Sequence, residues 1–180
     1  MARRPTRLFL AAALIAGCAA LPSSSARTVP EPVDESTREQ LATAARTVLQ
    51  KRNDALVHRV KSRSVPAEVA GVRLAPELVR RQRRAVRELE THNRAPVPGG
   101  PPYIAVRTRL GIDQVIRAGD RIVLDATEFT EARYESPGGR RAVTQRVRRR
   151  FEFRARGERL TLLREHLLDS GARPFNDPSR

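Results

Sequence analysis

Hydrophobic residues recur at helical spacing in the segment that follows residue 35. They share one face of the expected helix, and most of the arginines fall elsewhere. The members of this stripe are Leu41, Ala45, Val48, Leu49, Leu56 and Val60. Ser36-Thr37-Arg38-Glu39 precedes this run and is a capping box, in which the serine hydroxyl accepts a hydrogen bond from the third amide and the glutamate reaches back. The pattern predicts a helix over residues 37–61, ended by Val65-Pro66.

A second apolar stripe begins after Pro76, a residue that is tolerated at the first helical position because its missing N–H has no intrahelical partner there. The members of this stripe are Leu78, Val79, Gln82, Ala85, Val86 and Leu89. Arginines lie on or near the opposite face of the expected helix. The spacing predicts a helix over residues 76–93. The intervening segment 67–74 is either a short helix or a loop, and the proline- and glycine-rich run 95–102 ends all helix.

From residue 103 onward, apolar and polar residues alternate as they do in strands with one buried face. The alternation predicts strands over 103–110, 120–134, 143–153 and 159–168, with turns at 136–139 and 156–157. We therefore expect an α+β domain over residues 36–175, in which N-terminal helices pack on a curved antiparallel sheet of about four strands. A C-terminal tail, 176–180, follows it.

The second and third predicted strands carry complementary charge. Segment 114–139 has a net charge of −2 and segment 140–157 has +7. A hairpin centred on residues 137–138 would place Asp125 opposite Arg150 on the exposed face, with Ile122, Leu124 and Ala126 facing the other way. Cross-strand ion pairs of this kind contribute about 0.2–1 kcal/mol each. Half of the densest arginine run thus has a structural explanation.

The N-terminus has the pattern of an export signal. A basic start with Arg3, Arg4 and Arg7 is followed by the apolar run 8–16, which is about half of the ~20 residues that a membrane-spanning helix needs. Leu14-Ile15-Ala16-Gly17-Cys18 resembles the lipobox of bacterial lipoproteins. The resemblance implies cleavage between Gly17 and Cys18, and a diacylglyceryl thioether on Cys18 that anchors the chain in the cell membrane at its extracytoplasmic face.

Two alternatives to lipidation remain open. One is an ordinary secretory signal that is cleaved a few residues later, with Cys18 incidental. The other is twin-arginine export, although Pro5 and Thr6 follow Arg3-Arg4 where that signal has a different pattern. After Cys18, the Ser- and Pro-rich segment 18–35 has no periodicity and is expected to be a disordered tether.

Composition excludes several classes of protein. A single Cys excludes a disulfide framework and any multi-cysteine zinc site. Aromatic residues make up 4% of the chain and Trp is absent, which argues against a stacking platform for bases or sugars. The net charge is +15, or +12 without the three arginines of the signal peptide. Export separates the chain from nucleic acid, which leaves two interpretations of this charge: a solvated arginine-rich surface, or attraction to anionic lipid headgroups or acidic wall polymers.

The strand pattern also resembles a family. The matching segments are Arg107-Thr108, Gly119-Asp120-Arg121-Ile122-Val123, Ala126-Thr127-Glu128-Phe129-Thr130-Glu131, Phe151-Glu152-Phe153 and Leu160-Thr161-Leu162-Leu163. Together they are similar to a module of secreted actinobacterial proteins that often precedes an amidase-like domain. The resemblance covers roughly residues 36–175 and implies a nuclear transport factor-like, or cystatin-like, curved sheet with helices in its concavity. It supplies no catalytic residues.

Few residues are candidates for chemistry. His58, His92 and His166 lack the spacing of metal ligands, and no nucleophile motif or phosphate loop is present in the sequence. In the hairpin register above, Glu128 and Arg149 share the inner face with Leu124 and Phe151. His166 and Tyr134 could join them to form a pocket, in which a buried glutamate near a histidine could transfer protons. Alternatively, Glu128 and Arg149 only pair and close the end of the sheet.

These observations leave three functional hypotheses. The first is a non-enzymatic surface lipoprotein that binds a protein or another component of the cell envelope. The second is a small-molecule binder or degenerate enzyme that uses the concavity. The third is electrostatic docking to an anionic wall polymer or to lipid headgroups. None of them calls for a metal or a cofactor, and none has nucleic acid as a partner.

Overall fold

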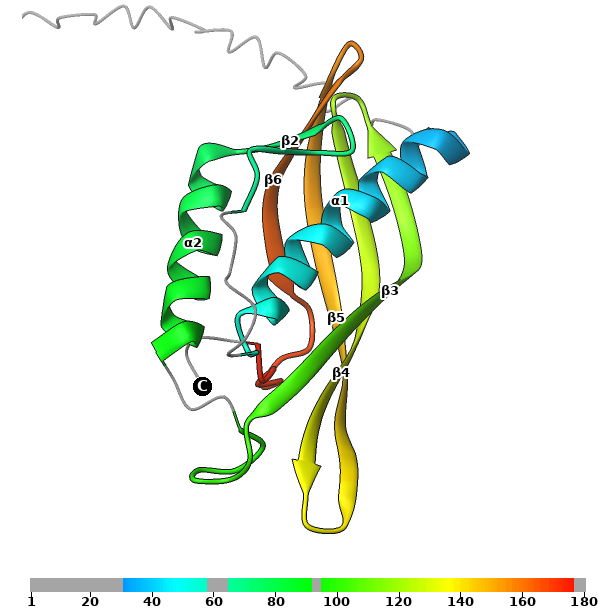
Figure 1. The fold of residues 1–180 in the computed structure, drawn as a ribbon. Helices are drawn as coiled ribbons and strands as arrows, with labels where there is room; N and C mark the ends of the chain where they lie inside the picture. The colour runs from blue at the N-terminus through cyan, green and yellow to red at the C-terminus, as the bar shows by residue number, and fades with distance from the viewer. Residues whose placement is uncertain (1–30, 58–64, 92–94, 177–180) are drawn as a thin grey trace, which may run out of the picture.

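The computed structural model describes residues 31–57, 65–91 and 95–176 (Figure 1). The expected signal peptide, Gly17 and Cys18 lie outside these ranges, as do most of the expected tether and the histidines at 58 and 92. Within the described ranges, no helix is long and apolar enough to cross a lipid bilayer.

The first helix, α1, spans Glu35–Asp54. Its N-cap is Asp34, whose carboxylate accepts a hydrogen bond from the Thr37 amide at 2.8 Å, so the predicted cap at Ser36 is wrong. Aspartate and serine are similarly good N-caps, and the aspartate comes first along the chain. The helix also ends earlier than expected, because the amides of residues 55–57 bond to carbonyls three residues back in tight turns.

The second helix, α2, spans Pro76–Thr91 and confirms the predicted helix as far as the chain is described. Its buried residues are Leu78, Val79, Gln82, Val86 and Leu89, which form the predicted stripe apart from half-buried Ala85. The arginines of α2 are exposed. Figure 1 shows α2 beside the β6 end of the sheet, while α1 crosses the sheet's face.

The sheet has six strands rather than four. They are β1 (Glu68–Val69), β2 (Val72–Leu74), β3 (Tyr103–Ala118), β4 (Arg121–Ser136), β5 (Gly139–Arg156) and β6 (Arg159–Leu167), in the order β1-β2-β6-β5-β4-β3. β3 to β6 form the predicted antiparallel meander. β2 pairs with β6 in parallel, so the sheet is mixed, and segment 67–74 is a small hairpin rather than a helix or loop.

The register of the β4–β5 hairpin confirms the sequence prediction. Asp125 lies opposite Arg150, and the two side chains form two hydrogen bonds of 2.7 and 2.8 Å. The central strands are longer than expected, above all β3, which continues through Gly111 and Asp113. A bulge between Ile112 and Gln114 absorbs Asp113, a residue type disfavoured in regular strands, while Gly111 keeps its register opposite Thr127.

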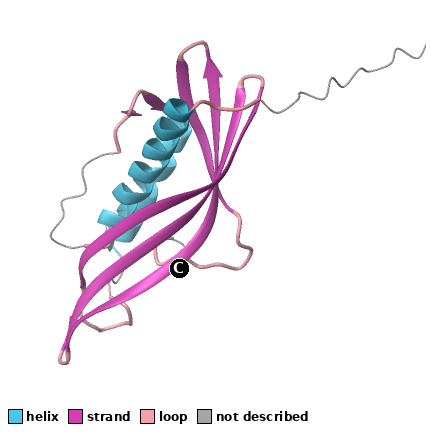
Figure 2. Ribbon diagram, turned by 90° about the vertical axis from the view of Figure 1, so that its right-hand side faces the viewer, coloured by secondary structure: helices cyan, strands magenta, loops and turns pink. Residues whose placement is uncertain are grey.

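One face of the sheet, here called the inner face, carries α1 and the core (Figure 2). Leu41, Val48 and Leu49 of α1 pack there against Leu124 and Phe151, all 0–1% exposed. A second cluster under the far end of α1 contains Ala55, Leu56, Val86, Leu89, Tyr103, Ala132 and Phe175. No helix covers the opposite, outer face in the described part of the chain.

The turn between β1 and β2 contains a backbone strain that yields a prediction. Ala70 and Gly71 have φ of 51° and 75°, the left-handed values of a type I′ hairpin turn. Asparagine adopts this conformation more readily than alanine, so Ala70→Asn is expected to raise the free energy of unfolding by about 0.5–1 kcal/mol. Gly71→Ala should lower it, because φ of 75° is strained for a residue with a Cβ. Urea denaturation measures both, and a stability loss in Ala70→Asn would contradict the prediction.

Candidate functional site

Glu128 of β4 and Arg149 of β5, which the sequence places on one face, form a buried ion pair. Arg149 Nε donates to Glu128 Oε2 at 2.5 Å, and the two side chains are 7% and 2% exposed. Leu124 and Phe151 lie on the same inner face. The pair thus lies at the end of the apolar core, where it continues the inward rows of both strands.

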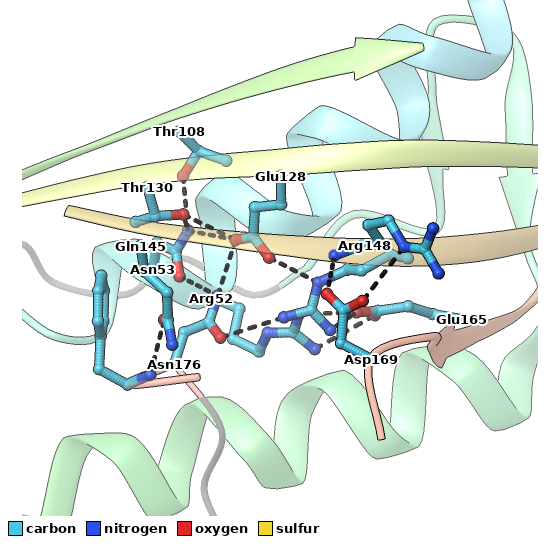
Figure 3. Close-up of polar contacts among 12 residues, drawn as sticks. Arg52, Asn53, Thr108, Glu128, Thr130, Gln145, Arg148, Glu165, Asp169 and Asn176 are labelled. Carbon is cyan, nitrogen blue, oxygen red and sulfur yellow. Dashed lines mark hydrogen bonds and ion pairs between the residues drawn. The ribbon is translucent and has the colours of Figure 1, made fainter. Parts of the chain in front are cut away.

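The other Glu128 oxygen is also fully engaged (Figure 3). Glu128 Oε1 accepts hydrogen bonds from Asn53 Nδ2 at 3.2 Å, Thr130 Oγ1 at 2.8 Å and Asn176 Nδ2 at 2.8 Å. Asn53 also donates to Thr108 Oγ1 at 2.5 Å. Four donors in all, three on Oε1 and one on Oε2, hold this carboxylate between α1, β4, β5 and the C-terminal segment.

Glu165 of β6 is the second buried carboxylate. Arg52 reaches it from the end of α1 with two hydrogen bonds of 2.7 and 3.2 Å, and Arg149 Nη1 and Gln82 Nε2 each donate at 2.8 Å. Burial alone would raise the pKa of Glu165. The charges of Arg52 and Arg149, with hydrogen bonds from Arg52 and Gln82, outweigh this effect and lower the pKa to about 2.

The C-terminal segment closes this polar cluster. Asn176 is 1% exposed and connects three elements through Asn53, Glu128 and Arg149 Nη2. Before it, Phe175 N donates to Gln145 Oε1, and the ring of Phe175 packs 6.1 Å from that of Tyr103. Packed structure therefore extends to Asn176, one residue beyond the expected domain boundary.

His166 and Tyr134, the other two predicted pocket residues, do not join the cluster. His166 lies on the outer face, where its side chain is 44% exposed and 3.5 Å from Glu152. Tyr134 is half-buried and packs against the second apolar cluster. The structure thus unites Glu128 and Arg149 with residues that the sequence reasoning missed: Arg52, Asn53, Gln82, Thr108, Thr130, Glu165 and Asn176.

A bulge explains why Glu165 points to the inner face where His166 was expected. From Leu160 and Leu162, strict alternation predicts that His166 points inward. The register of β5 and β6 shifts by one residue between Glu152 and Phe153, so that Glu165 pairs with Phe151 on the inner face. A shift of one residue moves every later side chain to the other face. The inward parity of Leu160 and Leu162 gives no sign of this shift.

A cavity of about 300 Å³ opens onto the cluster between α2, β6 and the C-terminal segment. Arg52, Gln82, Arg149 and Glu165 line its interior, and Arg81 and Arg84 of α2 lie among the other lining residues. Glu165, the buried carboxylate in this lining, already accepts four hydrogen bonds, two on each oxygen. The described residues include no group of three or more His, Cys, Asp or Glu that could hold a metal ion.

The outer face contains most of the remaining charge. Four of its carboxylates are paired with arginines on the same face: Asp125 with Arg150, Glu152 with Arg121, Asp169 with Arg148, and Glu131 with Arg133. These pairs are partly exposed and stabilise the fold little. Arginines outnumber carboxylates on this face, which leaves it positively charged.

The buried cluster predicts a strong dependence of stability on Glu165. Glu165→Gln would leave Arg52 and Arg149 without their shared counter-charge, and is expected to lower the free energy of unfolding by about 3–5 kcal/mol. Asp125→Asn is the matched control, because it removes one carboxylate from the partly exposed pair with Arg150 and should cost about 0.2–1 kcal/mol. Equal losses in urea denaturation would contradict a structural role for the cluster.

The same cluster predicts a loss of stability in acid. The pKa of Glu165 falls from its ordinary 4.5 to about 2 on folding, so its contribution is complete above pH 4.5 and is lost as the pH falls to about 2. The free energy of unfolding should therefore decline across this interval. Glu165→Gln should decline less steeply than the parent chain. Parallel pH profiles would show that Glu165 is not the responsible group.

Comparison with known proteins gives a structural likeness but no sequence relative. No family model matches the sequence, and no curated protein does. Among solved structures, the chain is similar to the intermembrane space region of the chloroplast protein ARC6, with a TM-score of 0.45 and 16% sequence identity. The match covers 78% of this chain and 100% of that one. It describes a broadly similar backbone path and says nothing about chemistry.

Proposed function

We propose that this protein is a lipid-anchored extracytoplasmic lipoprotein whose α+β domain is a non-enzymatic binding module of the cell envelope. The sequence Leu14-Ile15-Ala16-Gly17-Cys18 supports the anchor, and the Ser- and Pro-rich segment after it supports a tether to the membrane. Two acyl chains on Cys18 would hold the domain stably, since each buried methylene contributes about 0.8 kcal/mol.

One structural observation carries the binding role: the inner face is filled and the outer face is not. Apolar side chains of α1 occupy most of the inner face, and the cluster around Arg149 fills its end with hydrogen-bonded groups. A pocket enzyme would need a reachable acid, base or nucleophile there. The outer face, by contrast, is uncovered along four long strands and is rich in arginine, which suits binding to an anionic partner.

We infer a nuclear transport factor-like, or cystatin-like, architecture. The curved sheet and the helix α1 across its inner face support this inference, together with the strand motifs of the sequence. Proteins of this architecture use their concavity as a pocket, and in this chain side chains fill most of that space.

The anchor is tested by replacing the cysteine. In a bacterial host that processes lipoproteins, the full chain should incorporate radiolabelled palmitate and remain with the membranes. Cys18→Ser should abolish the label, and leave the chain either soluble or as uncleaved precursor. Ser24→Ala, which replaces a small side chain of the same segment but leaves the cysteine, is the control and should label normally. Labelling that persists in Cys18→Ser would refute the anchor.

A further inference from the structure

The free edge of the sheet bears an unusual concentration of charge. β3 is the last strand in the sheet order, with β4 as its neighbouring strand. Two surface hollows lie on either side of it, one of about 630 Å³ on the outer face and one of about 580 Å³ against α1. Arg107 and Arg109 line both hollows. The two arginines therefore form a bridge between two open depressions.

The outer hollow combines an exposed aromatic ring with guanidinium groups. Arg109, Phe129 and Arg146 occupy one row across β3, β4 and β5. Phe129 is 41% exposed, and Arg146 Cζ lies 5.7 Å from the centre of its ring. Aromatic rings and arginines are the side chains that contribute most to binding at protein interfaces. The row therefore has the composition of a contact surface.

The charge around both hollows favours an anionic occupant. Together they are lined by five cations, Arg46, Lys51, Arg107, Arg109 and Arg146, and by two carboxylates. Both carboxylates already have partners, since Asp54 accepts a hydrogen bond from Gln50 and Glu131 one from Arg133. In the described residues, no carboxylate forms an ion pair with Arg107 or Arg109. Their charge is open to a partner.

The chain itself shows how this edge receives an acidic residue. Glu31, in the extended segment before α1, donates its amide to the Arg117 carbonyl of β3 at 3.0 Å. The Glu31 carboxylate lies 3.7 Å from Arg117 Nε. An extended acidic segment thus already pairs with the same edge, further along β3.

The main-chain groups of residues 107–109 are less available to a partner than the side chains are. The Gln50 amide accepts from Thr108 N at 2.8 Å and donates to the Val106 carbonyl at 3.4 Å, so it occupies the outward groups of β3 there. This protects the edge against strand addition. A partner at this position would be held by side chains, through ion pairs with the arginines and apolar contact with Phe129.

We propose that an acidic, extended segment of a partner polypeptide docks across β3 at Arg107 and Arg109, with an apolar side chain against Phe129. This inference rests on the proposed function and names its partner class. An exposed phenylalanine ring between arginines favours a polypeptide over a phosphate polymer, because the polymer has no apolar side chain for the ring. The two hollows, joined at the arginines, fit an extended chain better than a small ligand.

The test uses the purified full chain and a labelled peptide with glutamates on both sides of one phenylalanine. Arg107→Glu/Arg109→Glu should weaken binding by at least about tenfold, measured by fluorescence anisotropy. Arg83→Glu/Arg87→Glu makes the same charge change on exposed positions of α2, at the other side of the sheet, and should leave affinity within about twofold. Equal weakening by both variants would show attraction to net charge alone and would overturn the proposal.

Phe129→Ser tests the apolar contact with the ring. It should weaken binding of the phenylalanine peptide by about fivefold and barely change binding of a peptide with serine in place of phenylalanine. Equal effects on both peptides would overturn the apolar contact. Thermal unfolding of each variant checks that the fold is retained, and the two substituted sites can be judged independently.

Two further probes separate the alternatives. Poly(glycerol phosphate) and vesicles containing phosphatidylglycerol are expected to respond equally to the β3 and α2 variants. If either one, rather than the peptide, depends on Arg107, Arg109 and Phe129, the polypeptide partner is wrong. Palmitate labelling of Cys18 does not enter these measurements, so failure of the docking site and failure of the anchor are distinguishable.

Discussion

The arrangement of this domain depends on one buried guanidinium. Arg149 of β5 binds Glu128 of β4, Glu165 of β6 and Asn176 of the C-terminal segment, and so holds three separate parts of the chain. Removing a charge from water is costly, and the cost is offset only when each N–H finds an acceptor. Strand register and the path of the chain end must therefore be right together.

The same requirement explains the end of α1. Arg52 and Asn53 lie in the last turn of α1. Both bind residues of the cluster, Arg52 to Glu165 and Asn53 to Glu128. The turns at residues 55–57 then direct the chain into the second apolar cluster. A polar interior of this kind specifies one alignment of helix and sheet, because any other would leave buried charges without partners.

Filling the inner face has a consequence for function. Two glutamates and two arginines are the buried ionisable groups of this cluster. They neutralise one another and are largely shielded from solvent. The outer face holds the remaining charge, and most of its carboxylates are paired with neighbouring arginines. The balance of carboxylates and arginines at each part of the surface therefore says more about a binding partner than the net charge of the whole chain. Arg107 and Arg109 at the β3 edge are among the arginines that form no ion pair with a carboxylate of the described residues, and they are the two that line both hollows.

The sequence by itself determined the α+β class, the extent of α2 and the register of the β4–β5 hairpin. These features follow from periodicity and from a tight turn, both of which are local, so Asp125 could be matched to Arg150. Only the tertiary structure decided the positions of Glu165 and His166, because a one-residue bulge in β5–β6 reverses the faces that simple alternation assigns. It also decided that β2 pairs with β6 and that Asn176 reaches Asn53 and Glu128. Such contacts join residues far apart along the chain, and their energies depend on burial that no local pattern reveals.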